Sequence, residues 1–343
     1  MEQCNLTYKF EILYISLSIK KIISLTMSEN KPVQLGLCCM NTSLKKCKPP
    51  IYASRRIIVR IVDERGIEEL KIRIIKNLED LLLMIDWNEA YGIKVFRLSS
   101  EMFMHKTNPK VPDYDYDFAL HLLKQIGEKA REYNHRLTFH PGQYNVLGTP
   151  REKVLKQTIA ELQYHADVLD LMEMGKDSVM VIHGGGVYGD KVGTTERWIN
   201  NYNNLSDSIK KRLVLENCER SYSIVDCLEI SEKCGVPVVF DTHHFECHKL
   251  LHPDIEFEPP EYYIPLILET WKRRDIKPKF HVSEQGSGRC GHHSDYIEIL
   301  PEYLLEIPEK YGVHIDIMIE AKMKELSIEK LYEKYPQCNC LIV

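Results

Sequence analysis

The stretch Val236–His244, which reads V-P-V-V-F-D-T-H-H, carries the signal from which the fold is predicted. Its apolar run, which ends at Phe240, is too short for a helix and rich in β-branched residues, so it predicts a buried strand. The run stops at Asp241, and His244 follows three residues later. A carboxylate and an imidazole at the end of a buried strand are metal-ligand types, and barrels of parallel strands carry their active sites there.

The same pattern recurs along the chain, because apolar strand-like runs alternate with longer stretches of helical spacing. The eight runs are Val33–Cys39, Ile93–Leu98, Arg136–Phe139, Ser178–Ile182, Arg212–Leu215, Val236–Phe240, Pro278–Val282 and His314–Ile319. The helices expected with them are Ile72–Tyr91, Tyr116–Tyr133, Lys153–Met174, Glu196–Ile209, Ser223–Cys234, Tyr262–Arg273, Tyr296–Tyr311 and a last one reaching about Tyr335. This alternation predicts an α/β protein with one domain, a (β/α)8 TIM barrel over residues 32–335.

A doubly wound open sheet is the rival fold. It would place a glycine-rich phosphate loop directly after the first strand, and no such loop stands there. The three glycines at 184–186 lack both the P-loop lysine and the G-x-G-x-x-G spacing. The barrel is therefore the preferred fold.

Two short extensions flank the barrel. In residues 1–31 the apolar run Phe10–Ile19 is about half the ~20 residues of a membrane span. Basic residues follow this run rather than precede it, which is unlike a signal peptide. We expect this extension to be disordered or dispensable and the protein to have no membrane partner. The tail 336–343 ends in Cys340-Leu-Ile-Val, a weak match to the prenylation pattern.

Composition describes an ordinary globular protein, with 44% hydrophobic and 28% charged residues. The net charge of −5 argues against a generic basic nucleic-acid binder, although bound divalent cations attract phosphate locally. The 11 cysteines are an odd number without a disulfide-framework spacing, which favours free thiols in a reducing compartment. We therefore expect a soluble intracellular protein, with nucleus and cytoplasm both open.

Metal-ligand side chains stand at the ends of six successive predicted strands. They are His140, His183, Glu216, Asp241 with His244, His281 and Glu320, and His293 lies in the loop after the seventh strand. A single strand-end histidine is more often a hydrogen-bonded structural residue, but a barrel brings all of these residues to one face. They exceed the four ligands of one zinc ion, so we expect two or three divalent ions and hydrolysis of a phosphate ester.

The remaining histidines have simpler interpretations. Those in predicted helices, His121, His135 and His165, are expected at the surface or in packing. The neighbours of better-placed residues, His243 and His292, are second choices as ligands, and His248 and His252 are expected in a loop.

Seven motifs in order resemble the ultraviolet damage endonucleases, which are related in fold to the abasic-site enzyme endonuclease IV. They are L-G-L-C-C-M-N (35–41), H-P-G-Q-Y (140–144), V-I-H-G-G-G (181–186), L-E-N (215–217), F-D-T-H-H (240–244), K-F-H-V-S (279–283) and M-I-E-A-K-M-K-E (318–325). The resemblance implies an enzyme that binds double-stranded DNA carrying UV lesions. Such an enzyme nicks the backbone immediately 5′ to cyclobutane dimers and 6-4 photoproducts, with abasic sites as a further substrate, and leaves a 3′-hydroxyl.

The resemblance also assigns roles to residues, with manganese as the usual metal. It implies one ion on His140, His183 and Glu216, a second on Glu216, Asp241, His281 and Glu320, and a third on His244 and His293. It makes Glu216 the bridging catalytic carboxylate, while Lys279 contacts phosphate or completes the metal site. Lesion or DNA contacts are implied for Asn41, His105, Gln143 and Tyr144, and we expect the enzyme to be a monomer.

This sequence departs from the related patterns at two positions. Gly291 stands where endonuclease IV has an aspartate in its third metal site, and Leu37 stands where bacterial members have a tyrosine. The first departure leaves the third site incomplete, and the second removes one stacking surface.

Two alternatives remain open at this point. A sugar isomerase or epimerase barrel also uses His, Glu, Asp and Lys around divalent metals, but it has no use for Gln143-Tyr144 or for the basic stretch Lys45–Arg60. A non-catalytic binder of damaged DNA has no need for a full set of metal ligands.

Overall fold

The computed structural model describes residues 31–342, and the expectation for residues 1–30 lies outside this range. Its eight strands are all paired in parallel, in the order β3-β2-β1-β8-β7-β6-β5-β4. They are β1 (Val33–Cys38), β2 (Val95–Arg97), β3 (Arg136–Thr138), β4 (Met180–His183), β5 (Leu213–Glu216), β6 (Val238–Asp241), β7 (Lys279–Val282) and β8 (Ile315–Ile319).

One isolated bridge joins the two outer strands of this order. Phe139 pairs in parallel with Met180 just beyond β3. Its N–H donates to the Val179 carbonyl at 2.9 Å, and its carbonyl accepts from Val181 at 3.0 Å. The sheet is therefore nearly closed on itself, and the predicted (β/α)8 barrel is confirmed.

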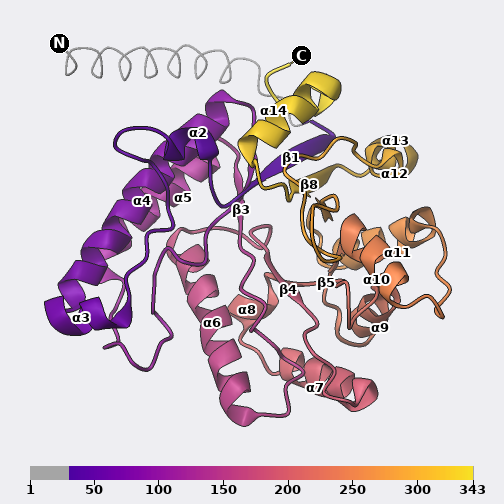
Figure 1. Cartoon of the computed structure of the whole chain (residues 1–343), viewed down its shortest axis with the longest axis horizontal. Helices are drawn as coiled ribbons and strands as arrows, with labels where there is room; N and C mark the ends of the chain where they lie inside the picture. The colour runs from indigo at the N-terminus through magenta and orange to yellow at the C-terminus, as the bar shows by residue number, and fades with distance from the viewer. Residues whose placement is uncertain (1–30, 343) are drawn as a thin grey trace.

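Helices cover the outside of the strands (Figure 1). The longer ones are α4 (Ile67–Ala90), α5 (Leu120–Glu132), α6 (Glu152–Leu171), α7 (Lys191–Asn203), α9 (Ile224–Cys234), α10 (Thr242–Leu251), α11 (Pro260–Lys272) and α14 (Glu325–Lys334). The short ones are α2 (Thr42–Lys45), α3 (Val59–Arg65), α8 (Asp207–Lys210), α12 (Glu302–Leu305), α13 (Ile307–Tyr311), η1 (Asp117–Ala119) and η2 (Pro336–Cys338). None of the helices within residues 31–342 combines the length and apolar character needed to cross a membrane.

Helix α9 illustrates how the sequence sets these elements. Ser223 and Asp226 form a reciprocal capping box at its start, and Gly235 ends it in the left-handed region with φ 76°. Ile224 and Ile230 are fully buried on the face that packs toward the barrel. Burial of each such side chain stabilises the fold by about 1.5–3 kcal/mol.

Three expectations about helices are wrong. The single helix expected over Glu196–Ile209 is two, α7 and α8, because the Ser206 side chain caps a new helix by accepting from Ile209. The helix expected over Tyr296–Tyr311 is an irregular segment followed by α12, whose N-cap is Pro301, and α13, which has Pro308 in its first turn; proline has no N–H to donate, so it is favoured at the start of a helix and interrupts a longer one. The loop expected around His248 is helix α10.

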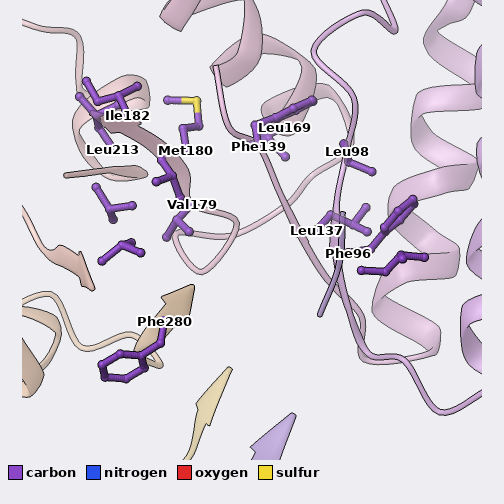
Figure 2. Close-up of a cluster of buried hydrophobic side chains, with 14 of the residues drawn as sticks. Phe96, Leu98, Leu137, Phe139, Leu169, Val179, Met180, Ile182, Leu213 and Phe280 are labelled. Atoms are coloured by element: carbon purple, nitrogen blue, oxygen red, sulfur yellow. The ribbon is translucent and has the colours of Figure 1, made fainter. Parts of the chain in front are cut away.

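The core lies between the strands and the surrounding helices. Figure 2 shows Phe139 beside Leu169 of α6, and Leu137 beside Phe96. Along β7 the side chains alternate, so that Phe280 packs in this apolar layer while Lys279 and His281 point into the barrel. Close packing of this layer holds the strand ends rigidly, and the strand ends carry the polar residues discussed below.

The C-terminal segment packs on the barrel. Cys338 and Cys340 are buried, and the Gln34 side chain donates to the Cys340 sulfur at 3.6 Å. The Tyr332 hydroxyl donates to the Gly92 carbonyl at 3.1 Å. A Cβ at Gly92 would lie 2.3 Å from Asn339, so the tail depends on a glycine at that position. Because its thiol is buried, Cys340 is not presented to solvent as prenylation requires.

Candidate metal centre

Glu216, the last residue of β5, lies at the centre of a ring of imidazoles. Its Oε2 is 2.9 Å from His140 Nε2 and 3.5 Å from His183 Nε2. Its Oε1 is 2.8 Å from His281 Nδ1 and 3.7 Å from His244 Nδ1. The carboxylate is fully buried. Histidines from four different segments of the chain therefore meet at one side chain, as expected for the carboxyl ends of barrel strands.

The ligand-type atoms fall into three overlapping groups, and within each group they lie within 4.8 Å of one another. The groups are His140 with Glu216 and His281, His183 with Glu216 and His244, and Asp241 with His281 and Glu320. His293 belongs to none of them, although its Nδ1 is 3.8 Å from Glu320 Oε2. The structure thus brings seven of the eight predicted ligands together and places the eighth at the edge.

This grouping differs from the one that the resemblance implies. His244 shares its group with His183 and Glu216 rather than with His293. His293 is held near the centre by a bridge between its backbone and Gln285. A site built on His244 and His293 alone has no further ligand at Gly291, whose φ of 91° favours glycine.

The start of α10 positions two of these ligands. The Asp241 side chain caps the helix by accepting from the His244 N–H at 2.7 Å. Asn217 supports both, because its amide pairs with the backbone of Asp241 at 2.8 and 3.0 Å and its carbonyl lies 3.1 Å from His244 Nδ1. Sequence reasoning missed this role of Asn217 and missed α10, although Asp241 before T-H-H is an N-cap signal.

Burial and the neighbouring charges shift the pKa values of the centre. The pKa of Asp241 is raised to about 7, mainly by burial. The neighbouring carboxylates of Glu216 and Glu320 contribute to this rise, whereas His244 opposes it. Burial lowers the pKa of His183 and of His281 to about 4, so both rings are neutral at pH 7. Burial opposes a charge on Glu320 too, but the guanidinium of Arg97 holds the pKa of that carboxyl below its usual range.

The residues present fit divalent cations. Three buried atoms on these residues have no hydrogen-bond partner, namely Asp241 Oδ2, His183 Nδ1 and His281 Nε2. Buried polar groups ordinarily find partners, so these atoms mark a missing one. Neutral imidazoles and carboxylates are the ligands of Mn²⁺ and Zn²⁺, and no cysteine belongs to the three groups in the described part of the chain.

Arg97 and Lys279 lie next to the ligands. The Arg97 Nη1 donates to Glu320 Oε1, a contact that sequence reasoning did not foresee. Lys279 is fully buried, and its ammonium donates to Thr138 Oγ1 at 3.2 Å. Burial, with Arg97 and Arg136 adding to it, lowers the pKa of Lys279 to about 7. Lys279 thus lies inside the barrel, away from any surface on which a duplex rests.

The four residues implied in DNA contact lie in the loops of the same face. Gln143 and Tyr144 are exposed, and 82% of the Tyr144 surface is accessible. They line a cavity of about 780 Å³ together with His105. The His105 ring is held by the Ile57 carbonyl at 2.7 Å and by Asn108 at 3.1 Å. Asn41 is buried and caps α2 by accepting from Leu44 at 2.8 Å.

The basic stretch Lys45–Arg60 divides into exposed and internally bound side chains. Lys45 is exposed. Arg55 lies over the Tyr52 ring at 4.1 Å, and its Nη2 donates to Asp80 at 2.6 Å. Arg55 is therefore tied to the fold through Asp80 and Tyr52.

Comparison with known proteins agrees with this geometry. The UV-endonuclease UvdE family matches residues 33–341. A relative from Acanthamoeba polyphaga mimivirus is 42% identical over 308 residues, which cover 88% of this chain and 91% of that protein. The UV-damage endonuclease of Schizosaccharomyces pombe is 36% identical over 90% of this chain, which spans 52% of that protein's length. The crystal structure of SacUVDE superposes with a TM-score of 0.76 at 31% identity, covering 89% of this chain and 99% of that chain. This chain belongs to the UV-endonuclease UvdE family.

Proposed function

We propose that this protein is a metal-dependent repair endonuclease that nicks double-stranded DNA immediately 5′ to UV photoproducts and leaves a 3′-hydroxyl. The observation that carries the proposal is the convergence of imidazoles and carboxylates on Glu216 in a chain of this family. Cyclobutane dimers and 6-4 photoproducts are the proposed substrates, and abasic sites are a further one. We propose Mn²⁺ as the metal and a monomer as the working form.

The chemistry of the centre supports hydrolysis of a phosphodiester. Two or three divalent ions on the ligand groups would lower the pKa of water and balance the charge that develops on the phosphate. Glu216 receives contacts from His140 and His281, which fix the orientation of both rings. Asp241, with its pKa near 7, is the carboxylate that depends most on a bound cation to stay ionised.

Lys279 has a supporting role in this proposal. A buried amine with a pKa of about 7 is partly neutral at physiological pH. Of the two roles that the sequence resemblance implies, completion of the metal site fits its position better than contact with DNA. We expect Lys279→Ala to reduce cleavage far more than it reduces DNA binding.

The sugar epimerase alternative fits the rim of the site less well. A small polyol needs a pocket that closes over it, whereas Gln143 and Tyr144 project into solvent. An exposed phenol beside a cation site fits a duplex, on whose base pairs an aromatic ring can stack.

A single experiment tests the proposal. The purified protein is incubated with MnCl2 and with a duplex that holds one cyclobutane dimer and a 5′ label on the damaged strand. We expect one product that ends directly 5′ to the dimer, that a DNA polymerase extends, and that disappears with a chelator. The same duplex without the dimer is the control. Intact damaged duplex after incubation with Mn²⁺, or cleavage that ignores the dimer, would contradict the proposal.

A further inference from the structure

Lys324 has a backbone conformation that disfavours a lysine. It precedes α14, four residues after Glu320, with φ 52° and ψ −121°. L-residues rarely adopt a positive φ, whereas glycine adopts it at no steric cost. Such a conformation is strained and persists only where the surroundings enforce it.

Hydrogen bonds of the residues on both sides of Lys324 enforce this turn. The buried carboxylate of Glu325 accepts from the N–H groups of Thr42 and Ser43, each at 2.7 Å. On the other side, the N–H of Met323 donates at 2.9 Å to the carbonyl of Asp295, two residues after His293. Lys324 is thus fixed between the loop that carries Asn41 and the loop that carries His293. None of these contacts uses the lysine side chain, so a glycine would satisfy the fold better.

The charge of Lys324 is not used by the fold. The side chain is half-buried, and no ion pair within residues 31–342 includes it. Its neighbour Lys322 is more exposed and lies 3.9 Å from Asp295. The residue Lys324 lies at the edge of the metal centre, because its N–H donates to the carbonyl of Ala321, the residue after Glu320, at 3.3 Å, and the N–H of Lys322 donates to the carbonyl of Ser294, next to His293, at 3.1 Å.

We infer that Lys324 binds a backbone phosphate of the DNA beside the metal centre, and that its strained turn aims the ammonium there. This inference rests on the proposed function. An ammonium has three donors and a compact charge, which suits a phosphate oxygen, and a phosphate on this rim would lie next to Glu320, one of the residues that would hold a cation. The strain is then a stability cost retained for substrate binding.

Two matched alanine variants test the inference. Lys324→Ala and Lys322→Ala each remove one ammonium, two residues apart. Binding to the single-dimer duplex is measured at several salt concentrations with Ca²⁺ in place of Mn²⁺ to limit cleavage. We expect Lys324→Ala to weaken binding and to reduce the slope of log K against log salt by about 0.9, the value for one phosphate contact. Lys322→Ala should leave the slope close to that of the wild type, and Lys324→Arg should restore it.

The variant Lys324→Gly distinguishes a role of the lysine in folding from a role in DNA binding. Glycine relieves the positive φ, so this variant should melt at or above the wild-type temperature while showing the weak binding of Lys324→Ala. A lower melting temperature would show that the lysine serves the fold and would overturn the inference. Equal salt slopes for Lys324→Ala and Lys322→Ala would overturn it as well. Failure of the wild type to nick in Mn²⁺ would instead refute the proposed function.

Discussion

The two ends of the barrel both bury charged side chains, but they balance them differently. At the amino ends of the strands, Asp316 lies 2.7 Å from Arg136 and 2.5 Å from Lys277. At the carboxyl ends, Glu216, Asp241 and Glu320 lie together, and Arg97 is the one permanent cation that pairs with them in the described part of the chain. Buried charges that the fold itself neutralises serve stability, whereas carboxylates left without enough cations indicate a site for a charged ligand.

The largest expected effect comes from Glu216→Gln at the carboxyl-end face. One neutral amide cannot serve two cations, so nicking should fall by roughly a thousandfold or more, of the order seen when a central electrostatic group is removed. The melting temperature without metal should fall modestly, because the amide keeps the shape of the side chain but loses the charge that faces His244, 3.7 Å away, whose pKa Asp241 and Glu216 raise to about 9 against the effect of burial. Cleavage is measured on the single-dimer duplex, and bound manganese by mass spectrometry. Wild-type turnover by this variant would remove Glu216 from the centre.

Asp316→Asn is the reciprocal change at the amino-end face. It leaves Arg136 and Lys277 buried or half-buried without their carboxylate, and breaking a buried pair in this way costs about 3–5 kcal/mol of unfolding free energy. Urea unfolding measures this loss. Cleavage per folded molecule and manganese content should stay at wild-type values. If this variant lost metal while keeping its stability, the contrast between the two faces would be false.

His165 offers an intermediate case, since it is buried like His281 but lies outside the metal centre. Its ring packs edge-on against Phe139 at 4.8 Å, and burial lowers its pKa from 6.5 to about 4. Between pH 4 and pH 6.5 the unfolded chain binds more protons than the folded chain. The stability that the neutral, buried His165 ring contributes is therefore complete above pH 6.5 and is lost as the pH falls toward 4. The loss at pH 4 amounts to about 3 kcal/mol.

The variant His165→Gln should therefore flatten the decline of unfolding free energy between pH 6.5 and 4, measured with a chelator present. His121→Gln on the exposed side of α5 is the control and should keep the wild-type decline. Parallel curves for His165→Gln and the wild type would show that the ring is already protonated in the folded state. Manganese content should be unchanged in both variants.

The contrast between the two ends of the barrel also explains which parts of the fold and of the metal centre could be predicted from the sequence. Strand ends are visible as an apolar run that stops at a polar residue, so Asp241 and Glu320 could be found from local pattern alone. The rule that parallel strands end on one face then brought them together. The barrel itself followed from the same alternation of runs.

Contacts between distant segments could not be read in this way. The pairing of Arg97 with Glu320 joins residues 223 positions apart, and Arg55 pairs with Asp80, which lies on another element. His135 was expected in a helix but lies buried just before β3, 2.9 Å from Glu89. Each of these depends on register and packing, which local periodicity does not specify.

The smallest effect is expected at the rim, where Gln143 and Tyr144 stand away from both sets of buried charges. Asn145 closes their turn by donating to the Gly142 carbonyl at 2.8 Å, which leaves the two side chains projecting beside the cavity. Opening a duplex at a lesion costs a few kcal/mol, and a phenol stacked on the exposed base pair returns about 1–3 kcal/mol. The double variant Gln143→Ala, Tyr144→Ala should therefore keep its full manganese content and its melting temperature. It should lose most of its preference for damaged over undamaged duplex at one fixed salt concentration, through weaker binding to the damaged one. If the variant still distinguished damaged from undamaged duplex as well as the wild type does, or if it lost manganese together with binding, the two rim residues and the metal centre would not act separately. Their exposure and burial indicate that they do.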